Sequence, residues 1–223
     1  MSVISSILFQ HEPWKYSTLP EDQRCCGINA KTFGLNDPAS KTTITKPRVV
    51  ENSVNETANF SNPDKFTVHC FHIGEFTNAI PKRDSTGAFI NRPSQCDELL
   101  YSDNRNCIIL AEIKVINRRG TKIKQLKKTL KCLLLISDAK EFFQTFTSKK
   151  CCFFRKIPSS NGMAPTLASS VAKHNRTPNR LEPHHHITNP SKGIQITGPQ
   201  AKCFEKYGFE LWHFSDGSAC TLI

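Results

Sequence analysis

Hydrophobic and polar positions are ordered most regularly between residues 66 and 156, so this part of the 223-residue chain is predicted to form the folded core. The segment FTVHCFHIG (66–74) alternates as a strand does, and CDELLY (96–101) and CIILAEIKV (107–115) predict two further strands. Polar residues at 103–106 predict a turn between these last two. Residues 95–115 are therefore expected to form an antiparallel hairpin.

The stretch TKIKQLKKTLKCLLLI (121–136) changes to a helical period. Its apolar stripe consists of Ile123, Leu126, Leu130, Leu133 and Leu134. Most of its lysines lie off that stripe, which predicts an amphipathic helix with a basic outer face. SDAKEFFQTF (137–146) predicts a second helix and KKCCFFRK (149–156) a further strand. This order predicts an α/β fold, with a mixed central β-sheet flanked by helices.

Outside this core the pattern is weaker, and we predict one domain over residues 1–223. Residues 1–64 are rich in Asn, Thr, Ser and Pro without a sustained period, which predicts an irregular arm with short strands. Residues 157–193 contain five of the 13 prolines and the run His184–His186, which predicts a long Pro-rich loop. Residues 194–223 predict a short helix that ends at Gly208, followed by a strand.

The charge balance narrows the choice of partners. The chain has 30 Lys and Arg residues against 19 Asp and Glu residues, a net charge of +11, which favours contact with nucleic acid or an anionic membrane surface. No apolar run is long enough to span a bilayer, and the start lacks a signal-peptide pattern, so we expect a cytoplasmic protein without a membrane partner. Its ten cysteines are then expected to be reduced thiols. A soluble protein that happens to be basic stays an alternative.

The predicted hairpin brings three charged residues together. A turn at 103–106 pairs residues whose numbers sum to 209, so Asp97 faces Glu112, and Lys114 points to the same side. Two carboxylates this close repel each other unless a cation lies between them, and such oxygen ligands suit Mg²⁺ or Mn²⁺. A lysine beside the metal can hold the attacking water and offset charge on a phosphate.

These residues resemble the PD-(D/E)XK nuclease superfamily: Asp97, then Glu112-Ile113-Lys114, then Gln125-Leu126 on the following basic helix. The resemblance implies a restriction-endonuclease-like core and metal-dependent hydrolysis of phosphodiester bonds in DNA, less often RNA. It implies that Asp97 and Glu112 are metal ligands, that Lys114 is the catalytic lysine and that Gln125 lies near the metal or substrate. The family's frequent use in bacterial and phage defence suggests an antiviral context.

The chain departs from the family pattern at Cys96, which replaces the proline before the aspartate. Glu75 is the candidate for the acidic group that some members carry upstream.

Basic residues follow the proposed catalytic strand and continue along the helix. The predicted nucleic-acid contacts are Arg118, Arg119, Lys122, Lys124, Lys127 and Lys128. Contacts of this kind with phosphates bind strongly but carry little sequence information. The predicted partner is nucleic acid, chiefly DNA, with a protein partner or a homodimer also open.

Other interpretations remain. The chain could be a noncatalytic nucleic-acid-binding or scaffold subunit that retains the fold, or a nuclease regulated by another chain, and the charged residues could form an ordinary surface ladder. A zinc site among His69, Cys70, His72 and His184–His186 is a rival, but His69 falls on the opposite strand face from Cys70 and His72, so this set does not converge. A Cys-His nucleophile pair also stays open.

Overall fold

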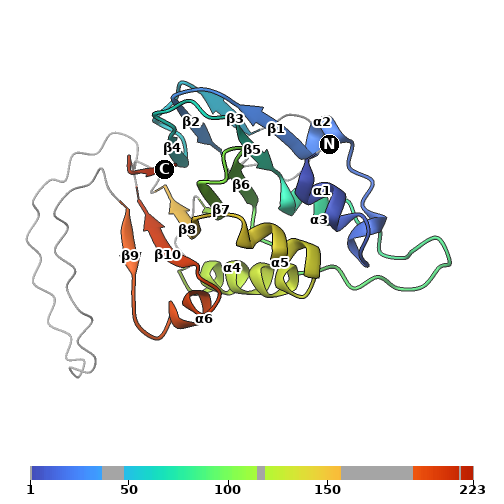
Figure 1. The fold of residues 1–223 in the computed structure, drawn as a ribbon. Helices are drawn as coiled ribbons and strands as arrows, with labels where there is room; N and C mark the ends of the chain where they lie inside the picture. Colours follow the sequence, from blue (N-terminus) through green and yellow to red (C-terminus); the bar gives the residue numbers. More distant parts are fainter. Residues whose placement is uncertain (1, 37–47, 115–118, 157–192, 216, 223) are drawn as a thin grey trace, which may run out of the picture.

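In a computed structural model, the described residues are 2–36, 48–114, 119–156, 193–215 and 217–222, with only the backbone described for 119–122. The predicted mixed α/β class is confirmed, because two mixed sheets are combined with mostly short helices (Figure 1). The helices are α1 (Val3–Leu8), α2 (Glu21–Arg24), α3 (Ile73–Asn78), α4 (Arg119–Leu134), α5 (Ser137–Gln144) and α6 (Lys202–Glu205), with a 3-10 turn at Trp14–Tyr16. No helix among the described residues is both long and apolar enough to cross a membrane.

The larger sheet has seven strands in the order β1-β5-β6-β7-β8-β10-β9. They are β1 (Cys25–Ile28), β5 (Val68–Phe71), β6 (Glu98–Ser102), β7 (Cys107–Lys114), β8 (Ser148–Arg155), β9 (Ile194–Ile196) and β10 (Glu210–Phe214). The pairs β7–β8 and β8–β10 are parallel, and the other pairs are antiparallel. A parallel connection needs a long crossover, and α4 and α5 supply it between β7 and β8.

The smaller sheet has four strands in the order β11-β4-β2-β3. They are β2 (Thr32–Leu35), β3 (Val49–Glu51), β4 (Ala58–Ser61) and β11 (Ala219–Thr221). Here β11 pairs parallel with β4, so the C-terminal strand completes a sheet built otherwise from the first third of the chain.

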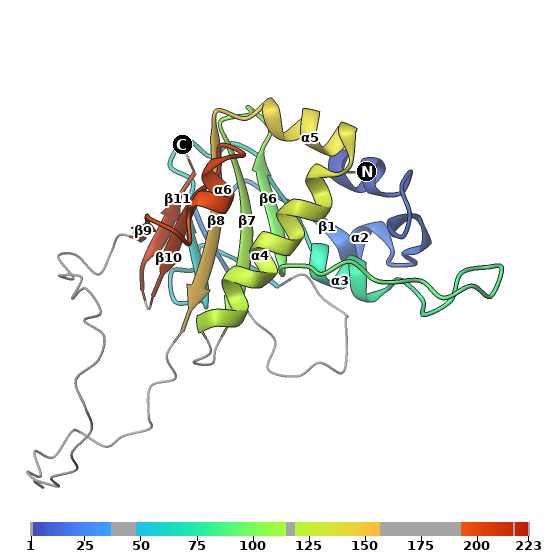
Figure 2. The ribbon, with the colours of Figure 1, turned by 90° about the horizontal axis from the view of Figure 1, so that it is seen from below.

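The large sheet lies between two different layers. Figure 2 shows α4 crossing β6, β7 and β8, and one apolar core, with Leu99, Leu110 and Leu126, fills the space under the helices. A second core, with Ile109 and Phe60, lies between the two sheets. Because both faces are covered, β7 is buried over nearly its whole length, which explains its almost continuous apolar sequence.

The hairpin and helix predictions are confirmed. The strands expected at 96–101 and 107–115 are β6 and β7, and the helices expected at 121–136 and 137–146 are α4 and α5. In α4 the stripe residues Leu126, Leu130 and Leu133 are buried, and Ile123 and Leu134 pack against them. The short helix and strand expected after residue 194 are α6 and β10, with Gly208 between them at a positive φ of 76°.

Two predictions need correction. The strand expected at 66–74 ends at Phe71, because α3 begins at Ile73. The short strands expected in the segment 1–64 are present, but they belong to the sheets and not to a separate arm: β1 joins the large sheet, and β2, β3 and β4 form most of the small one. Its strands are three or four residues long, too short to show a clear period. The predicted Pro-rich loop, with His184–His186, lies outside the described residues except for residue 193.

Candidate active site

The hairpin of β6 and β7 positions the three charged residues. Its pairs include Tyr101 with Ile108 and Leu99 with Leu110, so the predicted sum of 209 is confirmed. Glu98 and Ala111 form the pair nearest to Asp97, which lies just before β6. The Asp97 amide donates a hydrogen bond to the Ala111 carbonyl (3.1 Å), which keeps Asp97 beside the end of β7.

The side chains of Asp97, Glu112 and Lys114 converge as expected. Lys114 Nζ lies 3.1 Å from Glu112 Oε1 and 3.4 Å from Asp97 Oδ2. Asp97 Oδ2 also accepts a hydrogen bond of 2.7 Å from the backbone N–H of Ile113. One ammonium thus joins two carboxylates, and a backbone bond fixes the orientation of one of them.

The three side chains are buried to different extents, which affects how easily each one is ionised. The Glu112 side chain is 0% exposed, Asp97 is 18% exposed and Lys114 is 33% exposed, so the cluster opens to solvent on the lysine side. Burial raises the pKa of Asp97, although the Lys114 ammonium and the Ile113 N–H act in the opposite direction. Burial and the Lys114 ammonium thus act in opposite directions on the ionisation of Asp97.

Helix α4 holds the segment that leads into Asp97. The Cys96 amide donates a 2.6 Å hydrogen bond to Thr129 Oγ1, and Gln125 Nε2 donates to the Gln95 carbonyl at 3.4 Å. Gln125 is thus next to the site, but its described contact is with backbone and not with either carboxylate. Sequence reasoning missed Thr129, although a threonine between Leu126 and Leu130 on a buried stripe was the available signal.

Helix α3, which begins just after β5 ends, also supports the segment before Asp97. The Gly74 amide donates to the Asp97 carbonyl at 3.0 Å. A Cβ atom at Gly74 would lie 3.2 Å from the Cys96 carbonyl oxygen and 3.4 Å from the Asp97 Cα, so a glycine allows this close approach.

The predicted upstream acid, Glu75, makes a different contact. Its carboxylate pairs with Arg48 Nη2 at 2.8 Å, and burial raises its pKa. Arg48 is also paired with Glu98. Glu98 alternates with Leu100, whereas Glu112 alternates with Leu110, so these two glutamates lie on opposite faces of the large sheet. The described contacts of Glu75 thus associate it with Glu98 and not with Lys114.

The predicted nucleic-acid contacts are described only in part. Arg118 lies outside the described residues, and Arg119 and Lys122 belong to the first turn of α4 without a described side chain. Lys124 and Lys128 are exposed, and Lys127 is half-buried. The basic outer face predicted for α4 is therefore present at Lys124 and Lys128.

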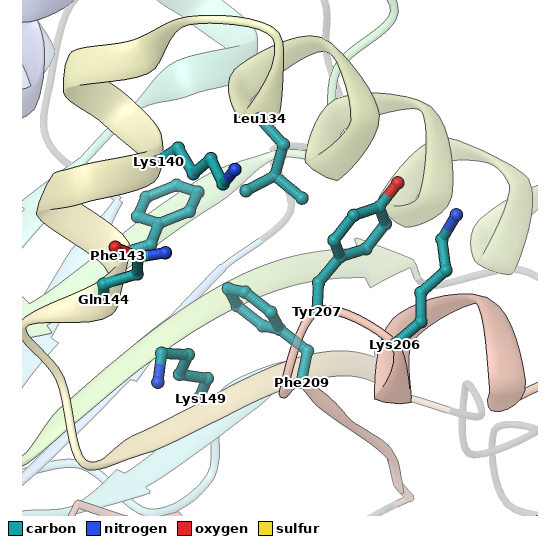
Figure 3. A pocket seen from close by; sticks show the side chains of 8 residues that line it. All are labelled: Leu134, Lys140, Phe143, Gln144, Lys149, Lys206, Tyr207 and Phe209. Carbon is teal, nitrogen blue, oxygen red and sulfur yellow. The ribbon is translucent and has the colours of Figure 1, made fainter.

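A separate hollow of about 370 Å³ is lined by residues of α4, α5, β8 and the segment between α6 and β10 (Figure 3). Lys149 lines it at the start of β8, whereas Lys114 pairs with Arg155 at the end of that strand. The other lining residues are Leu134, Lys140, Phe143, Gln144, Lys206, Tyr207 and Phe209. None of the predicted site residues lines this hollow, but its lysines offer a matched control for the basic face of α4.

The cluster has the donor chemistry that the predicted metal requires. Asp97 and Glu112 offer carboxylate oxygens, the ligands that Mg²⁺ and Mn²⁺ prefer, and protein sites for Mg²⁺ commonly use one or two carboxylates. Both groups reach one common cation, the Lys114 ammonium, within 3.5 Å. The residues therefore fit a magnesium or manganese ion.

Comparison with known proteins adds no relative. No family model, no curated protein and no solved structure matches the chain. What the fold and site define is a mixed α/β protein with a carboxylate–lysine cluster at the open end of a hairpin. The resemblance to PD-(D/E)XK nucleases stays a prediction, supported by the arrangement of these residues alone.

Proposed function

We propose that the chain is a metal-dependent nuclease of the PD-(D/E)XK type, which hydrolyses phosphodiester bonds in DNA. The observation that carries the proposal is the contact of Lys114 with two carboxylates, at 3.1 and 3.4 Å. This contact lies where β6 begins and β7 ends. Burying such charges is costly in a purely structural role, because desolvation opposes the charged forms. A function at the cluster accounts for that cost better than a surface ladder does.

Each residue has a distinct role in this proposal. Asp97 and Glu112 would hold Mg²⁺ or Mn²⁺, which when bound supplies Lewis-acid chemistry at a phosphate oxygen. Lys114 Nζ would donate hydrogen bonds to the attacking water and to the phosphate, on the side where its side chain is exposed. The Ile113 N–H holds Asp97 in position, and Gln125 and Thr129 hold the backbone before it.

The proposed substrate is nucleic acid because of the charge around the site. The chain carries a net charge of +11, and the exposed Lys124 and Lys128 lie on the helix that follows the catalytic strand. Phosphate contacts of this kind bind the polymer backbone irrespective of sequence.

The test is cleavage of plasmid, linear duplex and single-stranded DNA, and of RNA, with Mg²⁺, with Mn²⁺ and with EDTA. We expect cleavage of DNA with either metal and none with EDTA. Lys114→Ala is expected to slow cleavage at least ~100-fold, on the scale of removing one preorganised electrostatic group, while metal binding stays largely intact. Asp97→Ala and Glu112→Ala are expected to abolish cleavage and to weaken metal binding, since each removes a ligand.

Lys15→Ala is the matched control, because Lys15 forms an exposed pair with Glu12 away from the hairpin. It is expected to cut like the parent protein. Parental cleavage by both Glu112→Ala and Lys114→Ala would place the activity elsewhere. A parent that binds DNA but does not cut with either metal would favour the noncatalytic binding subunit instead.

A further inference from the structure

A second cluster of side chains lies on the other face of the large sheet, away from Asp97 and Glu112. Cys26 of β1 and Cys70 of β5 are directly paired residues, and His72 follows β5 by one position. Along β5, Cys70 and His72 point to the same side, whereas His69 points away and stacks on Tyr101. The expectation that Cys70 and His72 share a face is thus met, and Cys26 supplies the third group, 44 positions before Cys70.

The three side chains are close enough to hold one ion. One ligand atom of each, a sulfur from Cys26 and Cys70 and a nitrogen from His72, lies within 4.8 Å of those of the other two. Cys70 is 0% exposed and His72 is 1% exposed, whereas Cys26 is half-buried. The cluster therefore has a buried floor and one side that can admit an ion.

The histidine is oriented as a metal ligand commonly is. His72 Nδ1 lies 2.6 Å from Glu98 Oε2, and Arg48 pairs with the same carboxylate and with Glu75. A carboxylate that binds one ring nitrogen fixes the ring and makes the other nitrogen more basic. His72 Nε2, the other nitrogen, is buried, and besides Glu98 the side chain that hydrogen-bonds with His72 is Cys26.

We propose that Cys26 Sγ, Cys70 Sγ and His72 Nε2 bind a Zn²⁺ ion, with the fourth position open to water or a small ligand. Two thiolates and one imidazole form a soft donor set that zinc accepts in a tetrahedral site and that Mg²⁺ does not favour. On binding, the thiol protons and any proton on His72 Nε2 leave to solvent, and the two thiolate charges balance that of the ion. Glu98 stays outside the coordination sphere and orients His72.

Without metal, the three groups share protons that an ion has to displace. The hydrogen bond with Cys70 lowers the pKa of Cys26 to about 6, although burial acts against it. The same bond and burial raise the pKa of Cys70 well above its usual value. Burial would lower the pKa of His72, but Glu98 and Cys26 outweigh it and raise that pKa to about 10. Ion binding must therefore release protons from Cys70 and His72, so it is expected to weaken as the pH falls.

The experiment measures metal content directly and does not depend on nuclease activity. Full-length protein without a histidine tag is incubated with Zn²⁺ under reducing conditions and freed of loose metal, and zinc per chain is measured by mass spectrometry. We expect one tightly held ion, and Co²⁺ in its place should give the absorption of thiolate coordination. Cys26→Ser and His72→Ala are expected to lose the ion, and Glu98→Gln to weaken its affinity about 10–100-fold.

Two control variants distinguish the loss of this site from damage elsewhere in the fold. Cys152 and Cys220 are a buried thiol pair that share a hydrogen bond, so Cys220→Ser tests the removal of a buried thiol far from the cluster and should keep the ion. Asp97→Asn should keep zinc as well, because Asp97 belongs to the proposed nuclease site on the other face. Circular dichroism identifies any variant that has unfolded. Cys26→Ser is the variant least expected to unfold, because Cys26 is only half-buried.

Three outcomes would overturn the zinc site. The parent could bind less than a tenth of an equivalent of Zn²⁺ and give no thiolate absorption with Co²⁺. Folded Cys26→Ser and His72→Ala proteins could both keep zinc at the parental affinity. Finally, intact mass could show a Cys26–Cys70 disulfide that persists under reducing conditions, which would make the pair a covalent link between β1 and β5.

Discussion

The residue that departs from the family pattern, Cys96, makes a hydrogen bond that the family's proline could not make. Its amide donates to Thr129 Oγ1 at 2.6 Å, and a proline has no N–H to donate. Cys96 is also fully buried, so its side chain fills part of the core under α4. Cys96 and Thr129 thus act together to position Asp97, so Asp97 is supported without the proline of the pattern that the chain resembles.

Thr129→Val tests this support. It keeps the shape of the side chain but leaves the buried Cys96 N–H without its acceptor, so we expect a loss of about 1–3 kcal/mol in the free energy of unfolding. Cleavage should also fall, because Asp97 loses part of its anchor. Urea unfolding and the plasmid assay measure the two effects. Thr145→Val changes an exposed residue and removes a hydroxyl that donates only to the nearby Phe142 carbonyl, so it should cost less than about 0.5 kcal/mol.

Among the helices and strands, those whose structure depends on residues close in sequence could be predicted from the sequence. The β6–β7 register follows from one short turn, and α4 follows from a stripe of leucines with a helical period, so both could be predicted from neighbouring residues. The small sheet could not, because β11 pairs with β4 across more than half of the chain and its strands are three or four residues long. Cys26 was missed for the same reason, since only the fold brings it beside Cys70.

The basic face of α4 gives the prediction that belongs to this scale. Changing Lys124 and Lys128 together to alanine should weaken DNA binding irrespective of sequence. It should also reduce the slope of log affinity against log salt by up to about 2 for duplex DNA, because each phosphate that a lysine neutralises contributes about 0.9 to that slope. A salt titration of binding by fluorescence anisotropy measures this slope.

The matched control is Lys140→Ala with Lys206→Ala, which removes the same charge from exposed lysines at the hollow of Figure 3. These lysines line the hollow and not the basic face of α4, so the control should lower DNA affinity less and keep most of the salt slope. An equal effect of the two double variants would mean that net charge alone, and not the face of α4, attracts DNA.

Across the whole molecule, a column of aromatic rings joins the two sheets. Phe33 and Phe60 of the small sheet stack at 5.0 Å, Phe60 meets Phe154 of the large sheet at 5.1 Å, and Phe154 stacks on Phe214 at 4.9 Å. Phe154 pairs with Ile113, the residue between Glu112 and Lys114. The packing of the small sheet is thus connected through one strand to the backbone of the proposed nuclease site.

Phe60→Ala tests whether residues 1–223 fold as the single domain that the sequence predicts. Phe60 is 1% exposed, so its removal should leave a cavity and cost about 3–5 kcal/mol, whereas Phe89→Ala, at a side chain that is 72% exposed, should change stability by less than about 0.5 kcal/mol. In one cooperative domain, the urea transition of Phe60→Ala followed by circular dichroism should coincide with that followed by fluorescence of Trp14 and Trp212, which lie in different parts of the fold. A small sheet that unfolds separately would instead give two transitions. Only the transition at lower urea concentration would shift in Phe60→Ala, and the protein would keep its nuclease activity at urea concentrations between the two transitions.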